Sequence, residues 1–256
     1  MSAAMRLNCA FLASCTKANH PALMIGRGHL TAQGVRMLDY NFHWRPVFKS
    51  LPDLLAAGLT TLEIAALSMV LGIIFGLALA LIRMHMRGPL KWVASAWVEL
   101  ARNTPALFQL FFFGFGLGAV GIHMSPYVIV LAALSFNCAG YLAENFRGGF
   151  QAIPDTQIRA ARSLGMTAWQ SYTRIIIPQV FRIVYHPLTN QIVWAVLMSS
   201  LGMLVGFREL SGETQALASR TYRIFEYFAV TAVIYYVIVK IILGASRLLS
   251  ARLFRY

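Results

Sequence analysis

Residues 144–179 read ENFRGGFQAIPDTQIRAARSLGMTAWQSYTRIIIPQ. This polar, arginine-bearing segment separates two apolar runs, each about long enough to cross a bilayer. Connections between packed elements are usually far shorter, with a median of about 4–6 residues. The length and polarity of the segment therefore predict a structured element held at the membrane face.

Local signals divide this segment into two short helices. Pro154 and Asp155 precede a helical run over 156–164, and Gly165 stands where a left-handed helix stop belongs. Thr167 can cap a second helix, which we expect to end before Pro178. The sequence predicts a helix, a bend and a helix.

The same residues carry a resemblance to a known family. The segment resembles the "EAA" loop in the membrane subunits of bacterial ATP-binding-cassette importers, at Ala160, Ala161, Gly165, Ile175 and Pro178. The glutamate that opens the family motif is Arg159 in this chain. The resemblance implies that this loop couples the permease to its ATPase, with Arg162 beside Arg159. Because like charges across an interface repel, we expect an acidic or hydrogen-bonding counterpart on the ATPase.

Flanking motifs resemble one branch of that family, the polar amino acid permeases. These are Tyr141, Ala143 and Glu144 with Arg147, Gly148 and Gly149; Arg162 to Met166; Pro187 to Asn190; and, upstream, Glu99, Arg102, Thr104, Pro105, Gln109 and Leu110. The resemblance covers about residue 54 to the C-terminus. It implies an all-α membrane protein with five transmembrane helices and a cytoplasmic coupling-helix loop, the type I (MetI-like) importer permease fold.

The resemblance also implies partners and a cargo. It predicts a second permease subunit, identical or a paralogue, two cytoplasmic ATPase subunits and a periplasmic amino acid binding protein, all serving a bacterial inner membrane. Glutamate, aspartate or glutamine is the expected cargo class. The alternative is a secondary transporter or channel that works alone, but five spans without an inverted repeat do not build the paired midplane site of such carriers.

Composition independently indicates a membrane protein. Hydrophobic residues make up 58% of the chain and charged residues only 12%, which is more apolar than a soluble domain of this length requires. The net charge of +13 comes from basic residues dispersed between apolar runs. Without a nucleic-acid-binding motif, that dispersal argues against a nucleic acid partner.

Five apolar runs are candidate spans, at 54–82, 104–122, 127–143, 188–207 and 228–246. In the first run, Gly72 and Gly76 form a small face that another helix can approach closely. Lysines and arginines number four in the first connection, none in the second, five in the third, three beside three acids in the fourth, and three in the tail. This alternation predicts a periplasmic N-terminus and a cytoplasmic C-terminus.

The first 36 residues are expected to be a disordered or untranslated extension. Met37 is followed by a short aromatic leader at Phe42 to Trp44. The basic residues upstream would have to be translocated in the predicted orientation, against the usual charge bias. We therefore predict that translation starts at Met37.

Polar residues in or beside the spans are the candidate translocation path. They are Gln109, Asn137, Glu144, Asn190, Gln191, Ser199 and Ser200. Each could instead form a hydrogen bond to a neighbouring helix. As a set, however, they suggest a hydrated route for a polar solute. Relatives usually read Lys-Asp-Thr-Ser-Leu where this chain has residues 197–201 as LMSSL.

Two further expectations concern chemistry. Glu144 and Arg147 are three residues apart on a helix and can pair. We expect them to serve assembly or gating rather than solute binding.

The sequence holds no G-x-x-x-x-G-K-[ST] loop and no clustered metal ligands, so it predicts no catalytic activity, no metal and no cofactor in this chain.

Overall fold

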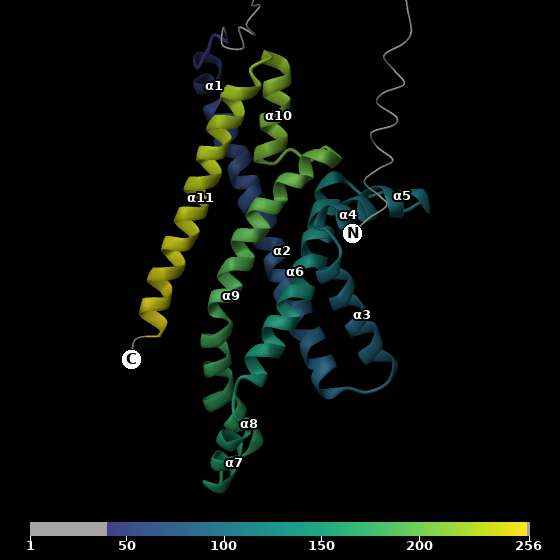
Figure 1. The fold of residues 1–256 in the computed structure, drawn as a ribbon, viewed down its shortest axis with the longest axis vertical. Coiled ribbons are helices and arrows are strands. Elements are labelled where there is room, and N and C mark those ends of the chain that lie inside the picture. Colours follow the sequence, from purple (N-terminus) through teal and green to yellow (C-terminus); the bar gives the residue numbers. More distant parts are fainter. Residues whose placement is uncertain (1–39, 255–256) are drawn as a thin grey trace, which may run out of the picture. The chain divides into compact units, whose positions relative to one another are not determined.

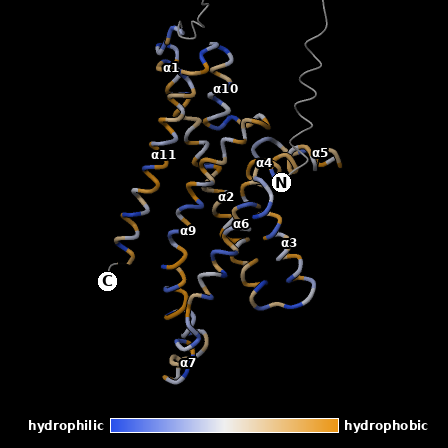
Figure 2. The backbone as a smooth tube through the Cα atoms, viewed as in Figure 1, coloured by the Kyte–Doolittle hydropathy of each residue, from blue (hydrophilic) through white to orange (hydrophobic). Residues whose placement is uncertain are grey.

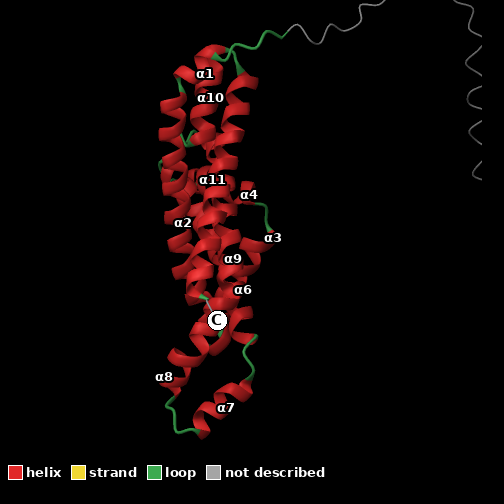
Figure 3. Ribbon diagram, turned by 90° about the vertical axis from the view of Figure 1, so that its left-hand side faces the viewer, coloured by secondary structure: helices red, strands yellow, loops and turns green. Residues whose placement is uncertain are grey.

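The computed structural model describes residues 40–254, and within that range every regular element is a helix (Figures 1 and 3). Contacts separate the chain into Met1–Asn41 and Phe42–Tyr256, and only the second unit is described below. The expected extension 1–36 and the proposed start at Met37 lie outside the described residues. The helices are α1 Arg45–Lys49, α2 Leu51–His85, α3 Pro89–Asn103, α4 Ala106–Phe111, η1 Phe112–Gly116, α5 Leu117–Ala119, α6 Pro126–Gln151, α7 Asp155–Ser163, α8 Ala168–Ser171, η2 Tyr172–Ile176, α9 Ile177–Met198, η3 Ser199–Val205, α10 Leu210–Thr221 and α11 Ile224–Leu253.

Within residues 40–254, four stretches of helix are long and apolar enough to cross a membrane: Leu51–His85, Pro126–Gln151, Ala168–Val205 and Ile224–Leu253. They contain the first, third and fifth predicted spans, and Ala168–Val205 covers the fourth predicted span, 188–207, except for its last two residues. A lipid interior offers no partner for a backbone N–H or C=O, so an apolar run of this length must become a helix there. Hydrophobic colour runs along most of α11 (Figure 2).

The second predicted span, 104–122, is shorter and broken. Its apolar helix covers Ala106–Ala119, about 20 Å at 1.5 Å per residue, against a hydrocarbon core of about 30 Å. The five-residue π-turn η1 interrupts it. Residues 83–103, expected to be a connection, contain the helix α3, which buries Ala94, Val98 and Ala101. Lys91 and Arg102 therefore lie on a helix.

The break between α3 and α4 follows from Pro105. Thr104 is extended, with φ −116° and ψ 143°, because a residue that precedes proline is pushed away from the helical region. Pro105 then occupies the N-cap of α4. In Figure 1, α3 lies beside α6 at the edge of the bundle, and the short apolar helix turns sideways from its upper end.

One predicted helix end was wrong, and one helix is longer than the span predicted within it. The helix α6 continues beyond the third predicted span, 127–143, to Gln151. The second short helix of the loop does not end before Pro178 but continues through η2 into α9. Pro178 lies in the first turn of α9. The wider π-turn before it accommodates a ring that would otherwise meet the carbonyl four residues earlier.

The central contact of the bundle is between α2 and α6. A Cβ atom built on Gly72 would lie 2.6 Å from Cβ of Cys138, and one on Gly76 would lie 2.9 Å from Cβ of Leu142. The small face predicted on the first span is confirmed, and α6 is the helix that it approaches. The α7–α8 loop lies at one end of the bundle, and α1 and α10 lie at the other (Figure 1).

A second close approach joins α3 to α6 and provides a test of this packing. A Cβ on Gly140 would lie 2.4 Å from Cβ of Ala101. We expect Gly140→Ala to lower the free energy of unfolding by about 1–3 kcal/mol through overpacking. Adding Ala101→Gly removes the clashing atom, so the two changes should show an interaction energy of about 1 kcal/mol or more in a double-mutant cycle.

The control for this prediction is Gly148→Ala, also on α6, where an added Cβ meets nothing within 4 Å. Thermal unfolding in detergent should give this control a midpoint equal to or above the wild type, since alanine favours a helix. Additive effects of Gly140→Ala and Ala101→Gly would contradict the proposed contact.

Candidate functional site

The α7–α8 loop ends its first helix with a left-handed glycine. Gly165 has φ 77°, as predicted. The N–H of Met166 donates to the carbonyl of Ala161 at 3.1 Å, and the N–H of Gly165 donates to the carbonyl of Arg162 at 3.0 Å. These two bonds form a Schellman motif, which satisfies carbonyls that the end of α7 would otherwise leave exposed.

The second half of the loop is also fixed by hydrogen bonds. Thr167 accepts from the N–H of Gln170 at 3.3 Å, and the N–H of Thr167 donates to Oε1 of Gln170 at 2.9 Å. This capping box starts α8 at the predicted residue. The Nε2 of Gln179 donates to Oε1 of Gln157 at 2.8 Å and so ties α7 to α9. Ala161 of α7 is buried.

The outer face of the loop is cationic and partly apolar. Arg159, Ala160, Arg162 and Gly165 are exposed, as is Pro178 on α9. Among residues 40–254, no carboxylate pairs with either arginine. Leu164 is 82% exposed and Trp169 is 76% exposed. Sequence reasoning missed these two residues, although large apolar side chains beside the motif glycine in a polar loop were the available signal.

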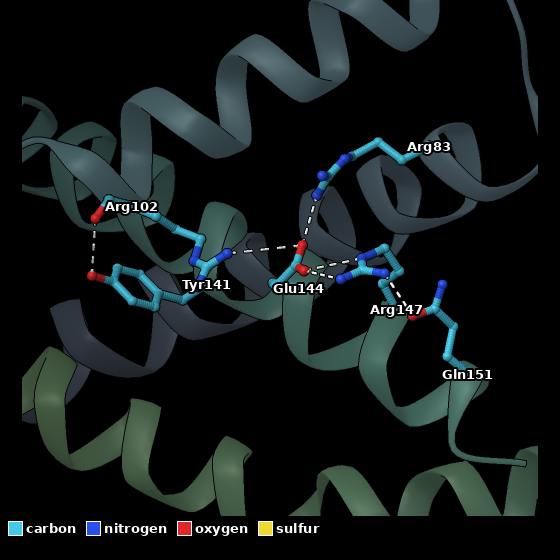
Figure 4. A network of polar contacts seen from close by, with 6 residues as sticks. All are labelled: Arg83, Arg102, Tyr141, Glu144, Arg147 and Gln151. Carbon is cyan, nitrogen blue, oxygen red and sulfur yellow. Dashed lines mark hydrogen bonds and ion pairs between the residues drawn. The ribbon is translucent and has the colours of Figure 1, made fainter.

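Glu144 is the shared ion-pair partner of three arginines from three helices (Figure 4). Arg83 of α2 donates to Oε2 of Glu144 at 2.7 Å, and Arg102 of α3 lies 3.9 Å from the same oxygen. Arg147, one turn further along α6, bonds Oε1 of Glu144 and donates to Gln151 at 2.6 Å. One carboxylate thus links α2, α3 and α6.

The predicted pair of Glu144 and Arg147 exists, but it is part of this larger cluster. The Glu144 side chain is 22% exposed and that of Arg102 is 41% exposed. The cluster is therefore partly open to solvent. It holds three guanidinium groups for one carboxylate, so its positive charges exceed its negative charges by two.

Gln109 and Asn137 form a separate pair. The Nδ2 of Asn137 donates to Oε1 of Gln109 at 2.9 Å, and both amides donate to the carbonyl of Ala101, at 3.1 and 2.9 Å. They hold the end of α3 and the start of α4 against α6. The Oδ1 of Asn137 is buried with no hydrogen-bond partner, beside a small cavity that Trp194 and Gly202 also line.

The other predicted path residues lie elsewhere. Gln191 donates to Sγ of Cys138 at 3.5 Å, and Ser199 and Ser200 donate to carbonyls in the last turn of α9. Asn190 is exposed and lines a groove between α9 and α11. The seven residues therefore occupy several places in the bundle rather than one site.

Glu209 is a fully buried carboxylate that sequence reasoning did not single out. It caps α10 by accepting from the N–H of Gly212 at 2.9 Å. It also accepts from Thr61 of α2 at 3.1 Å and from Tyr235 of α11 at 2.7 Å. Burial raises the pKa of the Glu209 carboxyl, and the hydrogen bonds act in the opposite direction. Its place directly before a helix was the available sequence signal.

This raised pKa predicts a pH effect with a definite sign. The folded chain holds the Glu209 proton more readily than the unfolded chain, so stability should fall as pH rises from about 4.3, the ordinary glutamate value, through the higher folded pKa. Glu209→Gln removes this dependence. In thermal unfolding across that window, the midpoint of the wild type relative to the Gln variant should decrease with pH. A difference that increases with pH would contradict the assignment.

Comparison with known proteins agrees with this geometry. Residues 69–255 match the family described as binding-protein-dependent transport system inner membrane component. The probable amino-acid ABC transporter permease protein YckA of Bacillus subtilis (strain 168) is 31% identical over 218 residues, which are 85% of this chain and 96% of the relative. The L-cystine transport system permease protein TcyB of the same organism is 31% identical over 215 residues, 83% of this chain and 92% of the relative.

A solved structure extends the likeness to three dimensions. The crystal structure of an amino acid ABC transporter with histidines contains a chain that matches with a TM-score of 0.78 and 31% identity, over 83% of this chain and 100% of that one. The EAA loop is a feature of this family, and the α7–α8 loop carries its spacing. This chain is a multi-pass membrane protein that belongs to the family of inner membrane components of binding-protein-dependent transport systems.

Proposed function

We propose that this chain is the permease subunit of an ATP-driven importer of a polar amino acid. The observation that carries the proposal is the α7–α8 loop, a rigid element whose outer face exposes Arg159, Arg162, Leu164 and Trp169. An exposed face that combines guanidinium groups with large apolar side chains suits a protein partner. The names of the relatives, an amino-acid permease and an L-cystine permease, support the cargo class.

The partners follow from the same proposal. Two cytoplasmic ATPase subunits receive the α7–α8 loops of two permease subunits, and a periplasmic binding protein delivers the amino acid. Ala160, Ala161, Gly165 and Pro178 shape the coupling element, while Arg159 and Arg162 provide its charge. Acidic or hydrogen-bonding groups on the ATPase are their counterpart.

The attachment of the loop explains how movement would reach the membrane. The Gln157 to Gln179 hydrogen bond joins α7 to the start of α9. A displacement of α7 is therefore transmitted to α9 as movement of a rigid body. The Glu144 cluster lies on α6, the helix that leads into the loop from the other side.

For the translocation path, we propose the Gln109 and Asn137 pair as the group most suited to meet a solute. Its unpartnered Oδ1 atom is a buried acceptor, and such an atom is costly unless a donor reaches it in another state. Glu144 serves assembly or gating instead. Glutamate, aspartate and glutamine remain the first solutes to test.

Reconstitution tests the function directly. Proteoliposomes with the permease, its ATPase and its binding protein should accumulate radiolabelled amino acid only when ATP is present inside with the ATPase. Liposomes that contain the permease alone should not. Gradient-driven uptake by the permease alone would favour the secondary transporter. ATP-dependent uptake of a different class of solute would contradict the proposed amino acid cargo.

The proposed orientation places the N-terminus in the periplasm and the C-terminus in the cytoplasm of a bacterial inner membrane. The charge count supports it, as does the location of the α7–α8 loop and α10 at opposite ends of the bundle (Figure 1). Reporter fusions after Gly121 and Gly212 should report a periplasmic location. Fusions after Arg87 and Gly165 should report a cytoplasmic location. The reverse pattern would overturn the orientation.

A further inference from the structure

A polar groove runs between α9 and α11, apart from the coupling loop and from the Glu144 cluster. Its volume is about 480 Å³, and it is lined by His186, Thr189, Asn190, Leu243, Ser246, Arg247, Ser250 and Ala251. This volume lies within the range of about 300–1,000 Å³ that is usual for ligand sites.

The floor of the groove is held by hydrogen bonds between the two helices. Tyr185 donates to the carbonyl of Ser246 at 2.7 Å, and the hydroxyls of Thr189 and Ser246 are 2.7 Å apart. These bonds fix the spacing of α9 and α11 at this level. The groove is therefore part of the folded bundle rather than a gap between separate helices.

The walls of the groove offer hydrogen-bond donors that the described part of the chain does not use. Within residues 40–254, the side chains of His186, Asn190, Arg247 and Ser250 make no hydrogen bond or ion pair with another residue. A second groove between the same helices is lined by Arg182, whose guanidinium lies over the Phe254 ring at 5.8 Å. Cationic groups without a carboxylate partner suit a phosphate or another anion.

The groove lies at the end of the apolar part of α11, where a lipid headgroup would be expected. Arg247 immediately follows the apolar run 228–246 of α11, where a span meets the headgroup region. The spanning part of α11 is only 6% buried within this chain, and its large apolar side chains Ile241, Leu248 and Leu249 are exposed. Acyl chains can lie along this surface while the headgroup occupies the groove.

We propose that the groove between α9 and α11 binds the phosphate headgroup of an anionic membrane lipid. Basic pockets between helices at the cytoplasmic side are suited to such headgroups. A second copy of the chain is a poorer occupant. A two-fold contact would place one cationic groove against the same surface of the partner, and opposed like charges are unfavourable.

Native mass spectrometry of the full permease complex in detergent tests this site. The probes are dioleoyl phosphatidylglycerol, dioleoyl phosphatidylcholine and glycerol phosphate without acyl chains. Phosphatidylglycerol should be retained more than either of the others. Arg247→Gln should weaken its binding about fivefold, the effect of one basic residue near an anionic surface.

Arg252→Gln is the matched control, because Arg252 carries the same charge on the last turn of α11 but lines neither groove. Ser250→Leu is a second variant that fills the groove and keeps the charge, and it should weaken binding as well. Equal losses from Arg247→Gln and Arg252→Gln, or equal binding of phosphatidylcholine, would overturn the site. Equal binding of glycerol phosphate would overturn the lipid as its occupant. Altered permease stoichiometry in Arg247→Gln with no lipid effect would assign the groove to a second copy.

Discussion

Replacing Gly165 by valine should leave the permease in the membrane but lower ATP-dependent amino acid uptake about tenfold, a size typical of coupling between sites. Gly165 has φ 77° and an added Cβ would meet nothing within 4 Å, so the effect is one of backbone strain and not of a clash. A β-branched residue in this region costs about 1 kcal/mol or more. Relief of that strain would re-aim α7 and separate its exposed face from the ATPase.

The control uses the same position. Gly165→Asn should retain most uptake, because asparagine adopts the left-handed conformation far more readily than valine. Membrane level, ATPase co-purification, ATP hydrolysis and uptake are measured for both variants. Arg159→Glu reverses the charge on the same face and should weaken ATPase co-purification. Normal uptake by Gly165→Val together with normal ATPase binding by Arg159→Glu would remove the α7–α8 loop as the coupling element.

Glu144→Gln should destabilise the permease by about 2 kcal/mol. Removing one partner from a fully buried ion pair costs about 3–5 kcal/mol, and partial exposure of this cluster, 22% for Glu144 and 41% for Arg102, reduces the effect. The change leaves three guanidinium groups without their shared carboxylate. Thermal unfolding in detergent and the yield of assembled complex measure the loss.

Two further variants separate this cluster effect from a general loss of charge. Arg83→Gln added to Glu144→Gln removes one uncompensated cation and should recover part of the stability. Glu213→Gln removes the carboxylate of a single pair with Arg208, whose side chain is 63% exposed and lies 3.7 Å from Glu213, and should change stability by less than about 1 kcal/mol. If Glu144→Gln instead altered amino acid selectivity with assembly and maximal uptake intact, Glu144 would belong to the path.

Local sequence signals were sufficient for much of the coupling loop. Gly165 and Thr167 act within one or two turns of their own positions, so their roles as helix stop and cap could be predicted and are confirmed. The end of the second short helix could not be predicted from local signals. Pro178 ordinarily indicates a boundary, and only the π-turn η2 allows α8 to continue into α9.

The candidate site depended more heavily on long-range contacts. Glu144 and Arg147 were predicted to pair because they are three residues apart, whereas Arg83 reaches the same carboxylate across 61 residues of sequence. Glu209 meets Thr61 from a distance of 148 residues. No local pattern contains such separations. The polar residues grouped as one path were therefore distributed over several places in the bundle.

The sequence by itself determined that this chain is a helical membrane protein with a structured polar loop between two spans. The reason is that a lipid interior requires each long apolar run to satisfy its backbone within a helix, and that glycine and threonine stop and start helices locally. Only the tertiary structure decided which helices meet. The approach of Gly72 to Cys138 and of Gly140 to Ala101, the shared carboxylate of Glu144 and the groove beside Arg247 depend on side-chain packing between segments distant in sequence, which composition and periodicity do not encode.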